Sequence, residues 1–113
     1  MIEITKLEEL DNLLNNTTKG ILIFFKHSNR CPISWNAKKE TDAFLEKHTE
    51  YKNNTYLINV IDSRPLSNHL ADTLKVEHQS PQIIILQNGS VVKHISHLTI
   101  TEKNLENILQ TLK

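Results

Sequence analysis

The sequence predicts an α/β protein with a central mixed β-sheet flanked by helices, and three observations lead to this prediction. Short apolar runs that suit buried strands alternate with longer segments whose leucines recur at helical spacing. Strands separated by helices favour parallel pairing, whereas Asn88-Gly89 between two apolar runs is the strongest short signal for an antiparallel hairpin. At 113 residues, the chain is expected to form one domain, residues 1–113.

The amino-terminal part is expected to contain a short edge strand and a helix. Ile2 and Ile4 suit the strand, and Thr5 followed by Glu8 has the capping-box pattern that precedes many helices. This helix is expected to end in the polar cluster 15–18. The leucines that recur at helical spacing along it are Leu7, Leu10, Leu13 and Leu14.

The middle of the chain alternates two strands with two helices. Gly20 precedes a continuous apolar run, 21–25, which suits a strand covered on both faces. A helix is expected over 32–48, then a strand over 56–61 and a helix that begins near Pro65. The inward candidates on these two helices are Ile33, Ala37, Phe44, Leu45, Leu66, Leu70 and Leu74.

The last third is expected to form a hairpin and a final helix. Apolar runs at 82–86 and 91–95 flank the Asn-Gly pair, and the helix is expected to begin near Thr99 or Thr101. One side of that helix carries Leu105, Ile108, Leu109 and Leu112.

Composition and charge exclude several classes of function. Thirteen basic and thirteen acidic side chains give zero net charge, so nothing favours nucleic acid or an anionic membrane surface as a partner. The longest apolar run is far shorter than a membrane span, and the first residues do not have the pattern of a signal peptide. A lone cysteine cannot form an internal disulfide, so we expect a cytoplasmic location.

The only cysteine, Cys31, stands where the loop after the first buried strand meets the next helix. Pro32 suits the first helical position, because its fixed φ fits the helix and its missing N–H would be unpaired there. The sulfur is therefore expected at the amino end of the helix, where free N–H groups and the helix dipole stabilise a thiolate. Arg30, and also Lys26 and His27, could add positive charge. This junction favours a reactive thiol over a buried, inert cysteine.

The residues around Cys31 carry a resemblance to a known family. The element order, the Cys-Pro-Ile-Ser motif at 31–34 and the later Ser80-Pro81 resemble the thioredoxin fold over nearly the whole chain. The same motif followed by Trp35 resembles, more narrowly, the YtxJ-like monothiol bacilliredoxins. The resemblance implies a thiol-disulfide oxidoreductase of redox homeostasis and stress response. It would hold no cofactor, use bacillithiol as co-substrate and act on bacillithiolated client proteins.

The resemblance also assigns roles around the nucleophile. It implies that Pro81 follows a cis peptide bond beside Cys31 and that Ser80 offers its backbone to a bound substrate. Ser34 takes the place of the resolving cysteine of dithiol thioredoxins, and a hydroxyl can hydrogen-bond the sulfur but cannot attack a disulfide. Phe25 stands where thioredoxins have a buried acid, so that proton route is expected to be absent.

The malyl carboxylates of bacillithiol could be bound by basic residues close to the motif. Arg30 and Lys38 are the candidates, although both suit solvated surface charges as well. His27 is a possible proton donor near neutral pH because of its position beside the thiol.

Three other functions remain open. A stress adaptor or binding module could use the same fold with Cys31 dispensable. A peroxidase or oxidation sensor could use the thiol, but Ser28 stands where peroxiredoxins have threonine. Iron–sulfur binding is disfavoured by Pro32, since cluster-binding monothiol glutaredoxins carry glycine there. His94 and His97 are expected to point to opposite faces of a strand, so no metal site is predicted.

Overall fold

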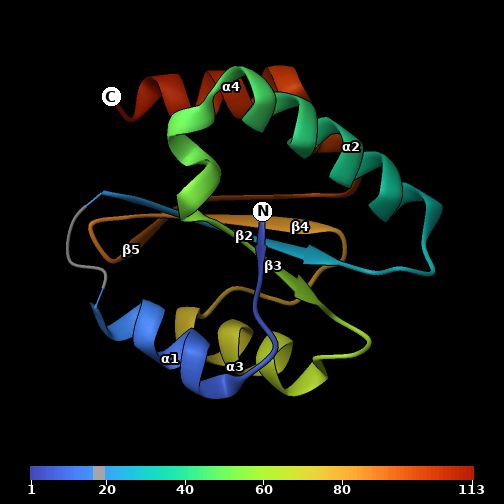
Figure 1. Ribbon diagram of the computed structural model, residues 1–113, viewed down its shortest axis with the longest axis vertical. Helices are drawn as coiled ribbons and strands as arrows, with labels where there is room; N and C mark the ends of the chain where they lie inside the picture. The colour runs from blue at the N-terminus through green and yellow to red at the C-terminus, as the bar shows by residue number, and fades with distance from the viewer. Residues whose placement is uncertain (17–19) are drawn as a thin grey trace.

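The computed structural model describes residues 1–16 and 20–113 of the chain. Its five strands form one sheet in the order β1-β3-β2-β4-β5 (Figure 1). β1, β3 and β2 run parallel to one another, whereas β4 is antiparallel to β2 and β5 is antiparallel to β4. The predicted mixed sheet is therefore confirmed. The strands are β1 (Ile2–Glu3), β2 (Ile21–His27), β3 (Thr55–Asn59), β4 (Gln82–Gln87) and β5 (Ser90–Ser96).

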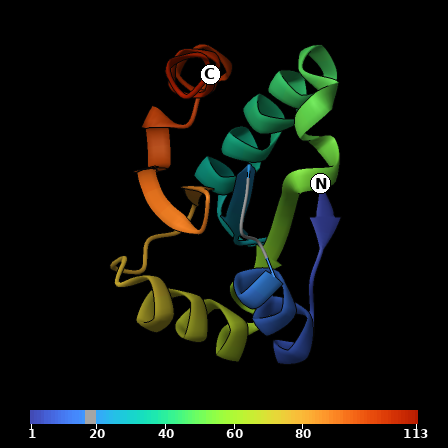
Figure 2. The same ribbon diagram turned by 90° about the vertical axis from the view of Figure 1, so that its left-hand side faces the viewer.

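Four α-helices cover the two faces of the sheet. Figure 1 shows α2 and α4 on one face and α1 and α3 on the other, and Figure 2 shows the same two layers from the side. None of the described helices is long and apolar enough to span a membrane. The helices are α1 (Leu7–Asn16), α2 (Pro32–Lys47), α3 (Arg64–Leu74) and α4 (Glu102–Thr111), with short 3-10 turns η1 (Thr49–Asn54) and η2 (His97–Thr99).

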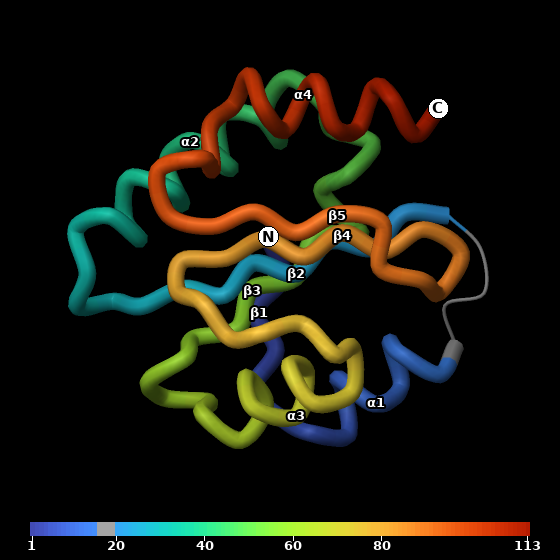
Figure 3. Tube along the Cα trace, turned by 180° about the vertical axis from the view of Figure 1, so that it is seen from behind, coloured from blue at the N-terminus to red at the C-terminus, as the bar shows by residue number. Residues whose placement is uncertain are grey.

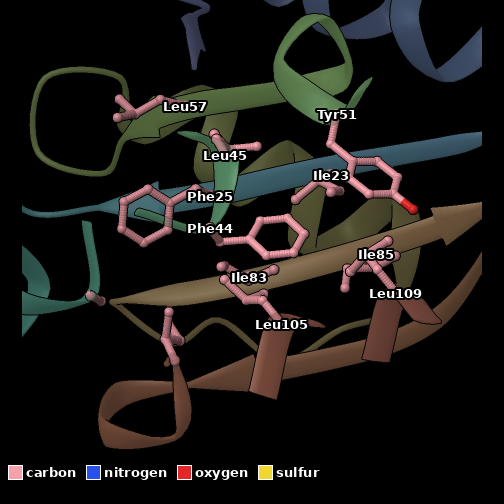
Figure 4. Close-up of a cluster of buried hydrophobic side chains, with 12 residues drawn as sticks. Ile23, Phe25, Phe44, Leu45, Tyr51, Leu57, Ile83, Ile85, Leu105 and Leu109 are labelled. Atoms are coloured by element: carbon pink, nitrogen blue, oxygen red, sulfur yellow. The ribbon is translucent and has the colours of Figure 1, made fainter. Parts of the chain in front are cut away.

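The central strand β2 separates two hydrophobic clusters, because alternate side chains of a strand point to opposite faces. Ile23 and Phe25 pack against α2 and α4 in the cluster drawn in Figure 4, whereas Leu22 and Phe24 pack against α1 and α3. Every residue of β2 after Ile21 is buried. The prediction of a strand covered on both faces is confirmed, and the strand extends two residues beyond the apolar run to His27.

The hairpin forms at the predicted turn. Asn88 and Gly89 have φ values of 53° and 85°, which are the two positive values that a type I′ turn requires. The Asn88 side chain also accepts a hydrogen bond from the N–H of Gly20 at 2.8 Å, and the Asn88 N–H donates to the Gly20 carbonyl at 3.0 Å. The turn therefore holds the start of β2 as well as joining β4 to β5.

Several local predictions were wrong in detail. Glu9, not Glu8, accepts hydrogen bonds from the backbone N–H groups ahead of α1, those of Thr5 at 3.2 Å and Lys6 at 3.1 Å. Ile33 is 40% exposed and does not face the core. His97 lies in η2 after the end of β5, so it is not on a strand with His94. Part of the polar cluster predicted to end α1, residues 17–18, lies outside the described residues.

One edge of the sheet gathers the elements that carry the candidate site. β2 and β3 end at this edge, β4 begins there, and α2 and α3 start from the loops that follow β2 and β3 (Figure 1). The N–H of Val60 donates to the carbonyl of His27 at 2.9 Å, which ties the two strand ends together. Figure 3 shows the segment after α3 returning along the sheet to the start of β4. The peptide bond Ser80-Pro81 in this segment is cis, as predicted.

Candidate active site

Cys31 is the N-cap residue of α2. Its backbone is extended, with φ −115° and ψ 118°, and Pro32 follows at the start of the helix. The Cys31 carbonyl accepts the first intrahelical hydrogen bond from the N–H of Trp35 at 3.1 Å, and the Cys31 N–H donates to Ser28 at 3.3 Å. The side chain is a free thiol, partly exposed, and caps no backbone group.

The first turn of α2 leaves N–H donors close to this cysteine. Pro32 has no N–H, and none of the hydrogen bonds among the described residues uses the N–H of Ile33 or Ser34. Donors at these positions are the ones that an N-cap side chain reaches in other helices. An anion at the Cys31 sulfur would meet the positive end of the helix dipole as well.

Ser34 joins the start of α2 to the end of β2. Its side chain is fully buried, and its hydroxyl lies 2.7 Å from Nδ1 of His27. The same oxygen accepts a hydrogen bond from the N–H of Ser28 at 2.9 Å. The structure therefore brings together His27 and Ser34 of the predicted site. The hydroxyl that replaces a resolving thiol holds the loop that carries Cys31.

His27 is enclosed by aromatic rings. Its ring stacks on Phe25 at a centroid distance of 5.7 Å, and Trp35 approaches edge-on at 4.6 Å. Burial lowers the pKa of His27 below its ordinary value, and the charge of Lys38 lowers it further. The imidazole is therefore neutral at neutral pH. Its Nε2 is buried without a hydrogen-bond partner among the described residues.

The basic residues predicted to meet bacillithiol lie in different surroundings. Arg30 is exposed in the turn before Cys31, and none of the ion pairs or hydrogen bonds among the described residues uses its guanidinium. Lys38 is paired with Asp42, one turn along α2, at 2.9 Å. The indole of Trp35 donates to the carbonyl of Asn29 at 2.7 Å and so fixes the same turn, while the ring remains half exposed.

Ser80 and Pro81 lie at the edge of the sheet from which the Cys31 loop leaves. β2 and β4 pair through Lys26 and Gln82, so Pro81 comes one residue before that pair. The carbonyl of Pro81 accepts a hydrogen bond from the N–H of His97 at 3.0 Å. The hydroxyl of Ser80 is buried without a partner in the part of the chain that the structure describes.

The structure buries a lysine next to the site, and the sequence analysis did not predict this burial. Lys26 is completely buried on the α1/α3 side of β2, and its Nζ lies 3.0 Å from Nδ1 of His78. Burial lowers the pKa of Lys26 to about 8. Its position at the end of a strand covered on both faces was the only sequence signal for this burial. His78 is 52 positions away, so sequence pattern could not identify the partner.

The candidate site brings no metal ligands together. No group of three or more His, Cys, Asp or Glu side chains is placed to hold a metal ion within residues 1–16 and 20–113. The site presents a single thiol at the amino end of α2, and the cis-proline Pro81 lies at the same edge of the sheet. The order of the elements and the cis-proline define a thioredoxin fold, with the single cysteine of the chain at the amino end of α2.

The family model for the monothiol bacilliredoxin BrxC matches residues 2–105, and the chain belongs to this family. A solved structure of a candidate oxidoreductase with a thioredoxin fold is 27% identical, with a TM-score of 0.82 over 94% of this chain and 90% of that one. Thioredoxin from Fasciola hepatica is 16% identical, with a TM-score of 0.76 and full coverage of both chains. Mitochondrial thioredoxin 3 from Saccharomyces cerevisiae is 15% identical, with a TM-score of 0.71 over 98% and 94%. At these lower identities the two thioredoxins show the fold alone. Family membership indicates a thiol-disulfide oxidoreductase.

Proposed function

We propose that the protein removes bacillithiol from mixed disulfides on client proteins, with Cys31 as the nucleophile. The Cys31 thiolate attacks the bacillithiol sulfur and forms a new disulfide to it. The bond between that sulfur and the client cysteine breaks, and the client thiolate leaves with the electron pair and takes up a proton. One disulfide is broken and one is formed, so no outside oxidant or reductant enters this step.

A second thiol exchange regenerates the enzyme. A second bacillithiol, as thiolate, attacks the bacillithiol sulfur bound to Cys31 and releases the Cys31 thiolate. The net reaction converts a bacillithiolated client and bacillithiol into a reduced client and bacillithiol disulfide. We expect it in the cytoplasm, where Cys31 would be kept reduced between turnovers.

The observation that carries this proposal is the position of Cys31 in the family's motif, partly exposed and at the N-cap of α2. A thiolate there would be stabilised by the free N–H groups of Ile33 and Ser34 and by the helix dipole. Arg30 would add positive charge from the preceding turn. The ring of His27 is neutral at neutral pH and adds no positive charge. His27 would instead contribute by holding the loop through its contact with Ser34.

Two residues explain why we propose a reaction that uses only one protein thiol. Ser34 cannot attack the disulfide on Cys31, so the bacillithiol adduct must be removed by a thiol from solution. Phe25, in the place of the buried acid of thioredoxins, lies in the hydrophobic cluster and offers no proton. Ser80 and Pro81 are proposed to bind the client segment next to the disulfide, with backbone groups as the contacts.

A turnover assay tests the proposal. A client protein that carries one bacillithiol is incubated with excess bacillithiol and a catalytic amount of enzyme, and the client mass is followed over time. We expect loss of the bacillithiol mass with the wild-type protein and none above the uncatalysed rate with Cys31→Ser. Turnover by Cys31→Ser at the wild-type rate would contradict the role of Cys31 and favour a binding module.

The same client carrying glutathione provides the matched comparison for the co-substrate. We expect faster removal of bacillithiol than of glutathione at equal concentrations of either thiol. Equal rates would show a general disulfide exchange without preference for bacillithiol.

A further inference from the structure

Three basic side chains gather on the α3 side of the sheet at the edge that carries Cys31. Lys26 Nζ lies 3.0 Å from His78 Nδ1, and the buried hydroxyl of Ser67 lies 3.3 Å from the same nitrogen. Arg64 precedes Ser67 by three residues on α3, which places both on one face of the helix. Burial lowers the pKa of His78, and the charges of Lys26 and Arg64 lower it further.

This cluster has no acidic partner among residues 1–16 and 20–113. None of the ion pairs within the described residues uses Lys26 or Arg64, and the carboxylates in those pairs are engaged elsewhere. Buried cations are usually paired with an acid, because an unpaired charge in the interior is unfavourable. A buried ammonium that contacts only neutral groups leaves a local excess of positive charge.

The contact with Lys26 determines which nitrogen His78 presents to solvent. An ammonium group can only donate, so Nδ1 of His78 accepts and the proton of the neutral ring is on Nε2. Because His78 is exposed, this N–H donor is accessible while the charge of Lys26 stands behind it. Arg64 is exposed as well and supplies a guanidinium, whose paired N–H groups suit a carboxylate.

The cluster and the nucleophile belong to the same edge of the sheet. Lys26 is five residues before Cys31, and His78 is three residues before Pro81, in the segment that returns to β4 (Figure 3). Arg64 opens α3 directly after the loop from β3, so that helix directs its positive end to the same edge. A ligand joined to the Cys31 sulfur could therefore extend from α2 across this edge toward α3.

We propose that Arg64 and His78, with Lys26 behind them, bind the carboxylates of the malyl group of bacillithiol. This inference rests on the proposed function, because it gives the co-substrate of the same site a second point of attachment. Lys38 is less suited, since Asp42 already neutralises it. A hollow of about 570 Å³ continues from His78 along α3, but Asp72 and Glu77 line it beside Lys75, so its two carboxylates disfavour an anion there.

Single-turnover kinetics test the role of the two exposed donors. Reduced enzyme is mixed with bacillithiol disulfide or with uncharged hydroxyethyl disulfide, and formation of the Cys31 adduct is timed. We expect Arg64→Gln and His78→Gln to slow the reaction with bacillithiol disulfide about fivefold to tenfold, the size of a lost charge-assisted hydrogen bond. The reaction with hydroxyethyl disulfide is expected to change much less.

Two further variants serve as comparisons. Lys75→Gln removes one positive charge from the end of the same helix and is expected to behave as the wild type with both disulfides. Arg30→Gln tests the other candidate. Equal slowing of both disulfides by Arg64→Gln, or an effect of Arg30→Gln in place of Arg64→Gln, would overturn the inference.

Binding of malate separates this inference from the proposed function. In the Cys31→Ala protein, which cannot exchange disulfides, malate is added and the ring resonances of His78 are followed by NMR. We expect saturable shifts that Arg64→Gln abolishes. If malate shifts the His78 resonances but the wild type shows no exchange activity, the anion site is supported and the proposed function is rejected. If the wild type exchanges disulfides but malate does not shift the His78 resonances, the anion site is rejected and the proposed function is supported.

Discussion

At the residue scale, Ser34 is more than a substitute for a missing thiol. Its hydroxyl connects Ser28, the first residue of the loop, to the ring of His27 and to the first turn of α2. The loop between Ser28 and Cys31 is therefore held at both of its ends. The placement of the thiol depends on this hydroxyl even though the hydroxyl has no part in the exchange itself.

We expect Ser34→Ala to lower the free energy of unfolding by about 1–3 kcal/mol, because the partly buried N–H of Ser28 and the buried Nδ1 of His27 lose their partner. Urea denaturation measures this change. Ser90→Ala, in the exposed hairpin, is the matched control and should stay within about 0.5 kcal/mol of the wild type. An unchanged midpoint for Ser34→Ala would show that water replaces the hydroxyl at no loss.

Lys26 is expected to destabilise the fold at neutral pH, because its ammonium is buried without a carboxylate. Lys26→Met keeps the length of the side chain and removes the charge. We expect it to raise the free energy of unfolding at pH 7 by about 1–3 kcal/mol. Lys39→Met, an exposed position on α2, is the control. A less stable Lys26→Met protein would contradict this view of the buried charge.

The pH dependence of Lys26→Met follows from the sign of the pKa shift. The folded pKa of Lys26, about 8, lies below its ordinary value of 10.5, so the unfolded chain binds more protons between these limits. The stability of the wild type should therefore rise relative to Lys26→Met as pH increases above 8. Denaturation of both proteins at pH 7, 8 and 9 measures the narrowing difference.

The sequence predicted the placement of Cys31 and Pro32 on the fold better than the surroundings of the candidate site. Cys31 and Pro32 were placed at the helix start by their order alone, because the N-cap and first-turn preferences are local. The burial of Ser34 and the outward position of Ile33 were missed, since adjacent residues of a helix point in different directions and packing decides which of them faces the core. The partners of Lys26 come from a distant segment, which no local pattern encodes.

At the scale of elements, the mixed character of the sheet and the hairpin were predictable for physical reasons. A helix between two strands favours a parallel crossover, as in β2-α2-β3, and the Asn-Gly turn specifies an antiparallel pair. The helix α3 is an exception, because it joins β3 to β4, which runs in the opposite direction. The edge position of β1 was predicted as well. The ends of elements were less predictable: β2 continues through Lys26 and His27, because tertiary burial overrides the polar character of these side chains.

The hairpin turn offers a test at this scale. Asn88→Ala removes the side-chain acceptor of the Gly20 N–H and places alanine at a positive φ, so we expect a loss of about 1–2 kcal/mol in stability. Asn88→Gly tolerates the backbone angle and loses only the acceptor. Its stability should therefore lie between those of the wild type and Asn88→Ala. Thermal denaturation ranks the three proteins. An Asn88→Gly protein as unstable as Asn88→Ala would assign the whole effect to the hydrogen bond.

At the scale of the whole molecule, acid is expected to unfold the protein partly through two of its histidines. The pKa values of His27 and His78 are both lowered, mainly by burial, so the unfolded chain binds more protons as pH falls below about 6.5. Stability is then lost on acidification by at most about 1.4 kcal/mol per pH unit for each group.

Unfolding free energies at pH 7 and pH 5 measure this contribution. The difference between the two values should be smaller in His27→Gln than in the wild type, whatever the stability of the variant at pH 7. His94→Gln, an exposed position on β5, is the control for removing a histidine. An unchanged difference in His27→Gln would show that this ring does not resist protonation in the fold.

The protein has one thiol, at the start of a helix, and no second thiol that could resolve an adduct. The proposed reaction therefore depends on which sulfur of the mixed disulfide Cys31 attacks. Equal amounts of reduced enzyme and a bacillithiolated client, without free bacillithiol, allow one exchange, and intact masses of both proteins are then recorded. We expect the bacillithiol mass on the enzyme and the client fully reduced, with Cys31→Ala receiving nothing. A disulfide between enzyme and client, or a client that retains its bacillithiol, would contradict the proposed reaction.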